Sequence, residues 1–143
     1  MLLNPEENHL IVKAIRQAEK RTSGEVRVFV ESRCRYMDAI DRAAELFFSL
    51  KMEETEDRNA VLVYVALKDH QLAVFADQGI YQQTGAEYWD KVVKEMISSF
   101  NKSDYAKGIA ECVIQIGEAL TTHFPYDKDT DKNELPDQIV FGN

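Results

Sequence analysis

The stretch Asp57–Ile80, DRNAVLVYVALKDHQLAVFADQGI, decides the fold. Its middle, AVLVYVAL, is almost continuously apolar and β-branched, a pattern that is typical of a strand buried on both faces. KDH at residues 68–70 predicts a turn, and QLAVFA predicts a strand that returns antiparallel to the first. The stretch therefore predicts a β-hairpin inside a sheet that is covered on both sides.

The two ends of this stretch are polar, DRN at the start and DQG at the finish. We expect the hairpin to pair about Asp69, which places Asn59 opposite Gly79 and brings the two polar ends together at one end of the sheet. Three valines of the first strand should then be buried: Val61, Val63 and Val65.

Patterns on both sides of the hairpin predict helices and one further strand. The expected order is a helix over 5–22, a strand over 25–32, a helix from Asp38 to Leu50, the two hairpin strands, a helix over 88–100, and a last helix capped by Ser103 and stopped by Pro125. A strand–helix–strand step is right-handed, so the first two strands should be parallel. We expect an α/β fold, a three-layer α/β/α sandwich around a small mixed sheet.

The chain has 143 residues, a length typical of one domain. We assign residues 1–124 to a single α/β domain and 125–143 to a polar C-terminal tail, whose IVF segment (139–141) is a candidate edge strand. The composition, 45% hydrophobic and 29% charged, is typical of a globular protein.

The net charge of −8 makes cations the natural counterpart and makes nucleic acid an unexpected partner, because phosphate backbones are repelled. No stretch is long and apolar enough for a signal peptide or a membrane span, so we expect no membrane insertion and a cytoplasmic location. Cys34 and Cys112 lie far apart in sequence, which indicates reduced thiols rather than a disulfide or a zinc site.

A metal site is the first hypothesis for the polar ends of the hairpin. The start of the first strand should lie at the same end of the sheet, so that Glu25, Asp57, Asn59 and Asp77 can converge there. Carboxylates and an amide carbonyl are the hard oxygen ligands that Ca²⁺ and Mg²⁺ prefer. Without a cation, these carboxylates should repel one another. The alternative is that the strand ends are polar simply because they reach solvent.

A second candidate site lies at the other end of the sheet. Arg33, Arg35 and Lys68 would suit an anion, and open α/β sheets bind ligands at the carboxyl ends of their strands. Cys34 stands between two arginines, which can lower a thiol pKa and favour a nucleophile. No glycine-rich phosphate cradle accompanies it, so an exposed basic patch with an ordinary thiol is the stronger interpretation.

Other metal motifs fail. The three histidines His9, His70 and His123 are isolated and give no zinc spacing. The segment DKDTDKNELPDQ (127–138) has Lys132 and Gln138 where a calcium-binding EF-hand loop needs glycine and glutamate. We interpret it as a solvated acidic tail.

The sequence resembles the TPM domain family, named after thylakoid lumen, photosystem II repair and acetylcholine-receptor modulator proteins. The resemblance runs from the first helix to Leu120 and rests on four stretches, RTSGEVRVFV, RNAVLVYVAL, FADQGI and KSDYAKGI. It implies an α/β/α sandwich. It also implies a function among those described for the family: calcium binding, weak acid phosphatase activity, or an accessory role beside membrane complexes.

By position in the family's motifs, the resemblance implies three site residues. They are Asp57 and Asn59, at the start of the second strand, and Asp104, at the start of the last helix. Ala60 departs from the family pattern, which has glycine after the asparagine. The export signal and membrane anchor common in the family do not appear in this sequence either.

Three functions remain open. The first is a non-catalytic binding or accessory domain with a divalent cation, Ca²⁺ or Mg²⁺, at the acidic end of the sheet. The second is a metal-assisted acid phosphatase that uses the same residues, with Asp57 or Asp77 as nucleophile or base and Arg58 holding the phosphate. The third is a protein-interaction module that binds a partner through its tail.

Overall fold

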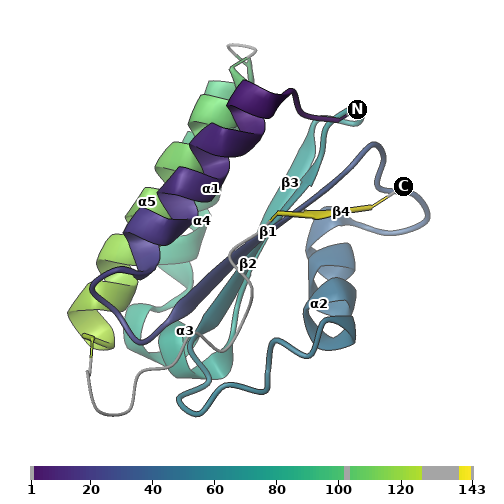
Figure 1. Cartoon of the computed structure of the whole chain (residues 1–143). Coiled ribbons are helices and arrows are strands. Elements are labelled where there is room, and N and C mark those ends of the chain that lie inside the picture. Colours follow the sequence, from purple (N-terminus) through teal and green to yellow (C-terminus); the bar gives the residue numbers. More distant parts are fainter. Residues whose placement is uncertain (1, 102–103, 127–138, 143) are drawn as a thin grey trace.

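The structure, a computed structural model, describes residues 2–101, 104–126 and 139–142, and Figure 1 shows it. This part of the chain forms five helices and a four-stranded mixed sheet. The helices are α1 (Pro5–Glu19), α2 (Ala39–Ser49), α3 (Gln78–Thr84), α4 (Ala86–Asn101) and α5 (Tyr105–His123). The strands are β1 (Glu25–Glu31), β2 (Ala60–Ala66), β3 (Gln71–Ala76) and β4 (Val140–Phe141).

The sheet has the order β3-β2-β1-β4, with β1 parallel to β2 and to β4, and β2 antiparallel to β3. Helices α1, α4 and α5 cover one face and α2 covers the other (Figure 1). The two faces of the sheet bury separate apolar clusters, the larger under α1, α4 and α5. The expected α/β/α sandwich around a small mixed sheet is confirmed.

The hairpin forms as predicted, and every residue of β2 is buried, including the three valines. Its register differs from the predicted one by one residue, because Val63 pairs with Val74 and Asp77 donates its backbone N–H to Ala60. The turn is centred between Lys68 and Asp69 rather than on Asp69, because four residues from Leu67 to His70 connect the strands and His70 takes a positive φ of 52°.

At the helix starts, one short helix was not predicted and one predicted cap was wrong. The segment after Asp77 is a short helix, α3, which the sequence pattern did not indicate because seven residues carry too little periodicity. The cap of α5 is Asp104, whose side chain accepts from the Lys107 N–H at 3.4 Å, and Ser103 lies outside the described residues. At α1, Asn4 and Glu7 form the reciprocal capping pair that fixes the helix start.

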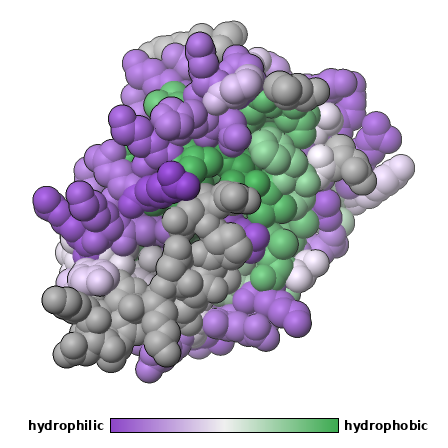
Figure 2. Space-filling model, in the orientation of Figure 1, coloured by the Kyte–Doolittle hydropathy of each residue, from purple (hydrophilic) through white to green (hydrophobic). Residues whose placement is uncertain are grey.

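The two edges of the sheet differ. At one edge, Val140 and Phe141 pair with Phe29 and Val30, so the expected edge strand from the tail is present at these residues. At the other edge, β3 pairs with β2 and has no second strand neighbour among the described residues. On the face that Figure 2 shows, hydrophilic residues surround a hydrophobic band that runs through the middle of the view.

None of the helices in the described part of the chain is long and apolar enough to cross a membrane.

Candidate functional site

The polar ends of the hairpin meet in an ion pair. Arg58 precedes β2 and Asp77 follows β3, and the guanidinium binds the carboxylate at two points, Nε to Oδ2 at 2.7 Å and Nη2 to Oδ1 at 2.8 Å. The Asp77 carboxylate is buried, and its Oδ1 also accepts from the backbone N–H of Gln78 at 2.8 Å, which caps α3. Beside this carboxylate, the pKa of Arg58 is raised, chiefly by the hydrogen bond to Asp77.

The backbone contacts of Gly79 explain why the polar end of the hairpin includes a glycine. Its N–H donates to the Arg58 carbonyl at 2.8 Å, and a Cβ at this position would lie 2.1 Å from the Asp57 carbonyl oxygen and 2.5 Å from that of Arg58. Backbone atoms cannot yield as a flexible side chain would, so only glycine fits this contact. Arg58 itself takes a positive φ of 52°. The start of α3 is thereby held against the segment before β2.

Glu25 and Asn59 lie at the same end of the sheet, as predicted. The Glu25 N–H donates to the Asn59 carbonyl at 3.4 Å, and both residues are buried. The Asn59 side chain contacts the Ser23 hydroxyl through Nδ2 at 3.3 Å, and its buried Oδ1 has no hydrogen-bond donor among the described residues.

The remaining two predicted ligands differ in position. Asp57 is at this end of the sheet, and its side chain is exposed. Asp104 caps α5 at the opposite end, because the ring of the next residue, Tyr105, contacts His70 in the hairpin turn at 5.9 Å between centroids. The structure thus groups Glu25, Asp57, Asn59 and Asp77, and it separates Asp104 from them (Figure 1).

This end of the sheet holds an ion pair instead of the expected repulsion between carboxylates. Arg58 supplies the positive charge that neutralises Asp77. The buried carboxylate of Asp77 therefore already has a partner. Within the part of the chain that the structure describes, no three acidic, histidine or cysteine side chains group as a metal site would require. The donors as arranged do not fit a Ca²⁺ ion held jointly by Asp57 and Asp77, because Arg58 would first have to leave.

The carboxyl end of the parallel strands carries the second predicted site, a pocket of about 820 Å³. Arg33, Arg35 and Lys68 line it, as expected, but Arg33 is paired with Asp69 at 3.1 Å. Two interactions of Glu31, which lines this pocket together with Arg42, were not indicated by the sequence. Arg42 binds Glu31 at two points, 3.0 and 3.1 Å, and the Tyr64 hydroxyl donates to the same carboxylate.

Neither cysteine is placed as a nucleophile. Cys34 is buried, its thiol donates to the Met37 carbonyl at 3.3 Å, and its N–H donates to Asp69 Oδ2 at 2.8 Å. Cys112 lies inside α5, where burial raises its thiol pKa to about 12. Both are free thiols, as predicted.

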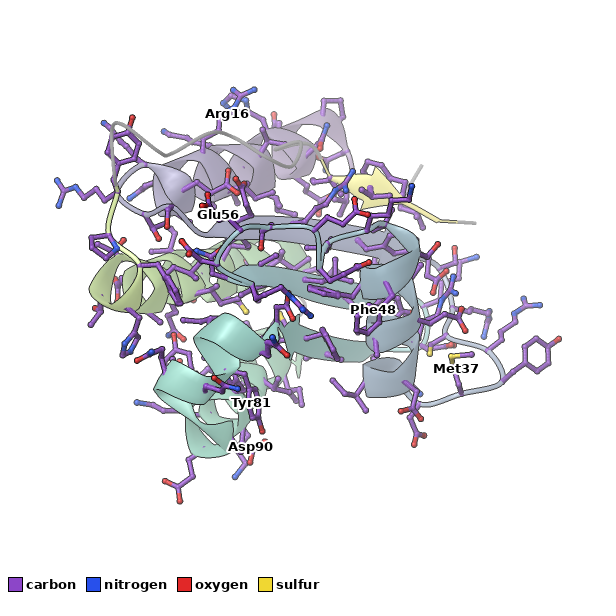
Figure 3. All side chains as sticks on the ribbon, turned by 90° about the horizontal axis from the view of Figure 1, so that it is seen from below. Arg16, Met37, Phe48, Glu56, Tyr81 and Asp90 are labelled. Carbon is purple, nitrogen blue, oxygen red and sulfur yellow. The ribbon has the colours of Figure 1, made fainter. Side chains whose placement is uncertain are left out.

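An apolar groove of about 830 Å³ runs along the free edge of β3, and sequence reasoning missed it. Ile40 of α2 and Tyr81 of α3 line it and are almost half exposed, 49% and 44%. Tyr81 and Asp90, both labelled in Figure 3, lie on the α3–α4 side. The sequence shows that positions 40 and 81 are large and apolar, but only the fold shows that they are exposed and brings them to one groove.

Comparisons with known proteins agree with this architecture. The family model described as the TPM domain matches residues 1–119. No curated protein matches the sequence. The NMR structure of BA42 protein from the psychrophilic bacterium Bizionia argentinensis is similar to the chain, with 38% sequence identity, a TM-score of 0.90, and coverage of 99% of this chain and 97% of that chain.

Two more distant structures share the fold. The N-terminal domain of a P. gingivalis protein is 16% identical, with a TM-score of 0.70 over 88% of this chain and 83% of that chain. The N-terminal domain of the cg2496 protein from Corynebacterium glutamicum is 12% identical, with a TM-score of 0.66 over 82% and 74%.

Proposed function

Because this chain belongs to the TPM domain family, we propose that it is a non-catalytic binding domain that attaches to a protein partner through the groove beside β3. The observation that carries the proposal is the groove itself, where exposed apolar side chains flank a sheet edge. Natural sheets protect such edges with charge, proline or a covering segment, and β3 (QLAVFA) carries neither charge nor proline.

The backbone of β3 supports binding of an extended segment. Asp77 directs its N–H toward Ala60 of β2, and in an antiparallel pair this direction alternates along the strand. Leu72, Val74 and Ala76 therefore direct their N–H and C=O groups toward the groove. An extended apolar segment of a partner can pair with these groups while its side chains contact Ile40 and Tyr81.

The contacts of the candidate catalytic groups favour binding over catalysis. A nucleophile or general base needs a free lone pair near the reacting atom. Both oxygens of Asp77 accept hydrogen bonds from Arg58. The same ion pair engages the Arg58 guanidinium, which was the group expected to hold a phosphate. The Cys34 thiol is buried and bonded to a backbone carbonyl.

The single tryptophan allows a direct test, because Trp89 lines the groove. The variant Ile40→Asp/Tyr81→Asp is compared with the control Ile97→Asp, which changes an equally exposed apolar residue (42%) of α4 outside the groove. Partners are captured with the parent chain, purified, and titrated against each variant while Trp89 emission is recorded. A partner that shifts Trp89 emission in the parent and the control, but not in the groove variant, supports the proposal. Partners that bind all three chains equally contradict it.

A divalent cation at the acidic end is the second candidate function, and one observation favours it. The buried Asn59 Oδ1 lacks a donor among the described residues, and a carbonyl oxygen in this state suits Ca²⁺ or Mg²⁺. Glu25, Asp77 and the exposed Asp57 lie at the same end of the sheet. Binding by Asp77 requires that Arg58, whose side chain is 36% exposed, swing into solvent.

The acid phosphatase alternative shares these residues and has a simple assay. Hydrolysis of p-nitrophenyl phosphate in Ca²⁺ or Mg²⁺ should not exceed that of Asp77→Asn. The tail-mediated alternative falls mostly on residues 127–138, which lie outside the described residues. A cytoplasmic location stays a prediction.

A further inference from the structure

A basic surface on α1 is separate from the β3 groove and from the acidic end of the sheet. Lys13, Arg16, Lys20 and Arg21 are exposed, and none of them forms an ion pair within the described part of the chain. The first three recur at helical spacing, so they share one side of the helix. Figure 3 shows Arg16 on the outer side of α1, directed away from the sheet. This concentration contrasts with the net charge of −8 for the whole chain.

These side chains border a groove of about 870 Å³ between α1 and α5. The helices approach closely beside it, because a Cβ on Gly117 would lie only 2.6 Å from the Ala18 Cα. The floor is uncharged where Ala18, Ile114 and Gly117 line it, and among the described residues Glu118 is the one acidic side chain in the lining. The surface is thus a trough whose α1 side is cationic, while its α5 side carries Glu118 and two threonines, Thr121 and Thr122.

We propose that this trough binds an acidic segment of a protein partner. Carboxylates spaced along an extended chain can pair with Lys13, Arg16 and Lys20, whose positions span about two helical turns and end at the C-cap of α1, Lys20. The inference goes beyond the proposed function, because no residue of this trough lines the β3 groove.

Charge favours a peptide over an extended polyanion. Screening limits interactions between exposed charges to about 8 Å at physiological salt, so a segment within the trough interacts mainly with the local positive charge. A nucleic acid duplex or an anionic bilayer would extend over neighbouring surface of a chain whose net charge is −8 and be repelled there.

The test uses fluorescein-labelled hexaglutamate as the probe and the intact chain as the receptor. Anisotropy is measured at about 0.05 M and about 0.3 M ionic strength, where screening differs strongly. The variant Lys13→Gln/Arg16→Gln/Lys20→Gln removes three charges and keeps good helix formers. The control Lys91→Gln/Lys94→Gln/Lys107→Gln removes three exposed charges outside the trough. Melting temperatures confirm that both variants are folded.

We expect salt-sensitive binding that weakens about tenfold in the trough variant, since three exposed ion pairs are lost, and by less than about twofold in the control. Absence of binding to the parent at low salt would overturn the proposal. So would equal losses in both variants, which indicate non-specific charge attraction. Tighter binding to phosphatidylserine vesicles or oligothymidylate, lost in the same variant, would assign the trough to a membrane or to nucleic acid instead.

Discussion

Arg58 and Asp77, separated by 19 positions in sequence, form a two-point ion pair that joins the start of β2 to the start of α3. The same carboxylate caps α3 through the Gln78 N–H. The polar residues at both ends of the hairpin stretch are therefore one structural unit, and removing Asp77 disturbs the ion pair and the helix cap together.

Asp77→Ala should destabilise the protein. Loss of the cap alone costs about 1 kcal/mol, which lowers the melting temperature of a domain of this size by roughly 2–4 °C, and loss of the ion pair adds to this. Asp57→Ala, at an exposed position nearby, should change the melting temperature by less than about 2 °C. Equal melting temperatures for both variants would show that neither the cap nor the ion pair of Asp77 contributes to stability.

The sequence predicted the hairpin and the layers because apolar and β-branched residues recur over enough positions to indicate buried strands and helices. It misplaced the register by one residue, since turn geometry at Leu67–His70 sets the register and apolar character is similar on both faces of β2. The site was harder. The predicted hairpin pairing placed Arg58 and Asp77 at the same end of the sheet, but which of several charged neighbours pair depends on side-chain geometry that spacing does not encode.

Asp104 shows a different limit. The family resemblance assigned it to the site by position in a motif, and its sequence neighbour Tyr105 contacts His70 at the far end of the sheet. The helical direction of α5 places the cap there, and no local pattern in KSDYAKGI reveals that direction.

Gly79→Ala should cost about 1–3 kcal/mol, because the added Cβ meets two backbone carbonyls and forces α3 away from the segment before β2. The melting temperature should fall by roughly 2–12 °C. Gly24→Ala is the comparison, since its Cβ would meet only the flexible end of the Leu120 side chain and should be tolerated better. A larger loss for Gly24→Ala than for Gly79→Ala would contradict the close approach at Gly79.

The variant Arg58→Gln distinguishes two states of the acidic end, one with the Arg58–Asp77 ion pair and one with a bound cation. If a cation competes with Arg58 for Asp77, melting temperatures recorded in chelator and then in millimolar Ca²⁺ or Mg²⁺ should show a larger rise in Arg58→Gln than in the parent. At a hundred times the dissociation constant, linkage gives about 2.7 kcal/mol, or roughly 5–11 °C. Asp77→Asn should abolish the rise. If neither ion raises the melting temperature of the parent or of Arg58→Gln, the acidic end is not a cation site.

The buried thiol of Cys112 gives a prediction for alkaline pH. Burial raises its pKa from 9.0 to about 12, so the thiol stays protonated in the folded chain and ionises on unfolding at lower pH. The unfolded state therefore binds fewer protons between these values, and stability should fall as pH rises through this window. Burial also raises the pKa of Tyr88 to about 12 and produces a similar slope, so the two residues need separate variants.

We expect the loss of stability above pH 9 to be shallower in Cys112→Ala and in Tyr88→Phe than in the parent, and denaturant melts at a series of pH values would measure it. The comparison uses slopes, because removing either side chain also changes stability by an amount that does not depend on pH. In the native protein, iodoacetamide should modify Cys112 and Cys34 slowly at neutral pH, since both thiols are buried, and rapidly after denaturation. Parallel pH profiles for parent and Cys112→Ala, or rapid modification of the native chain, would show that the thiol of Cys112 is accessible and ionises as an ordinary cysteine.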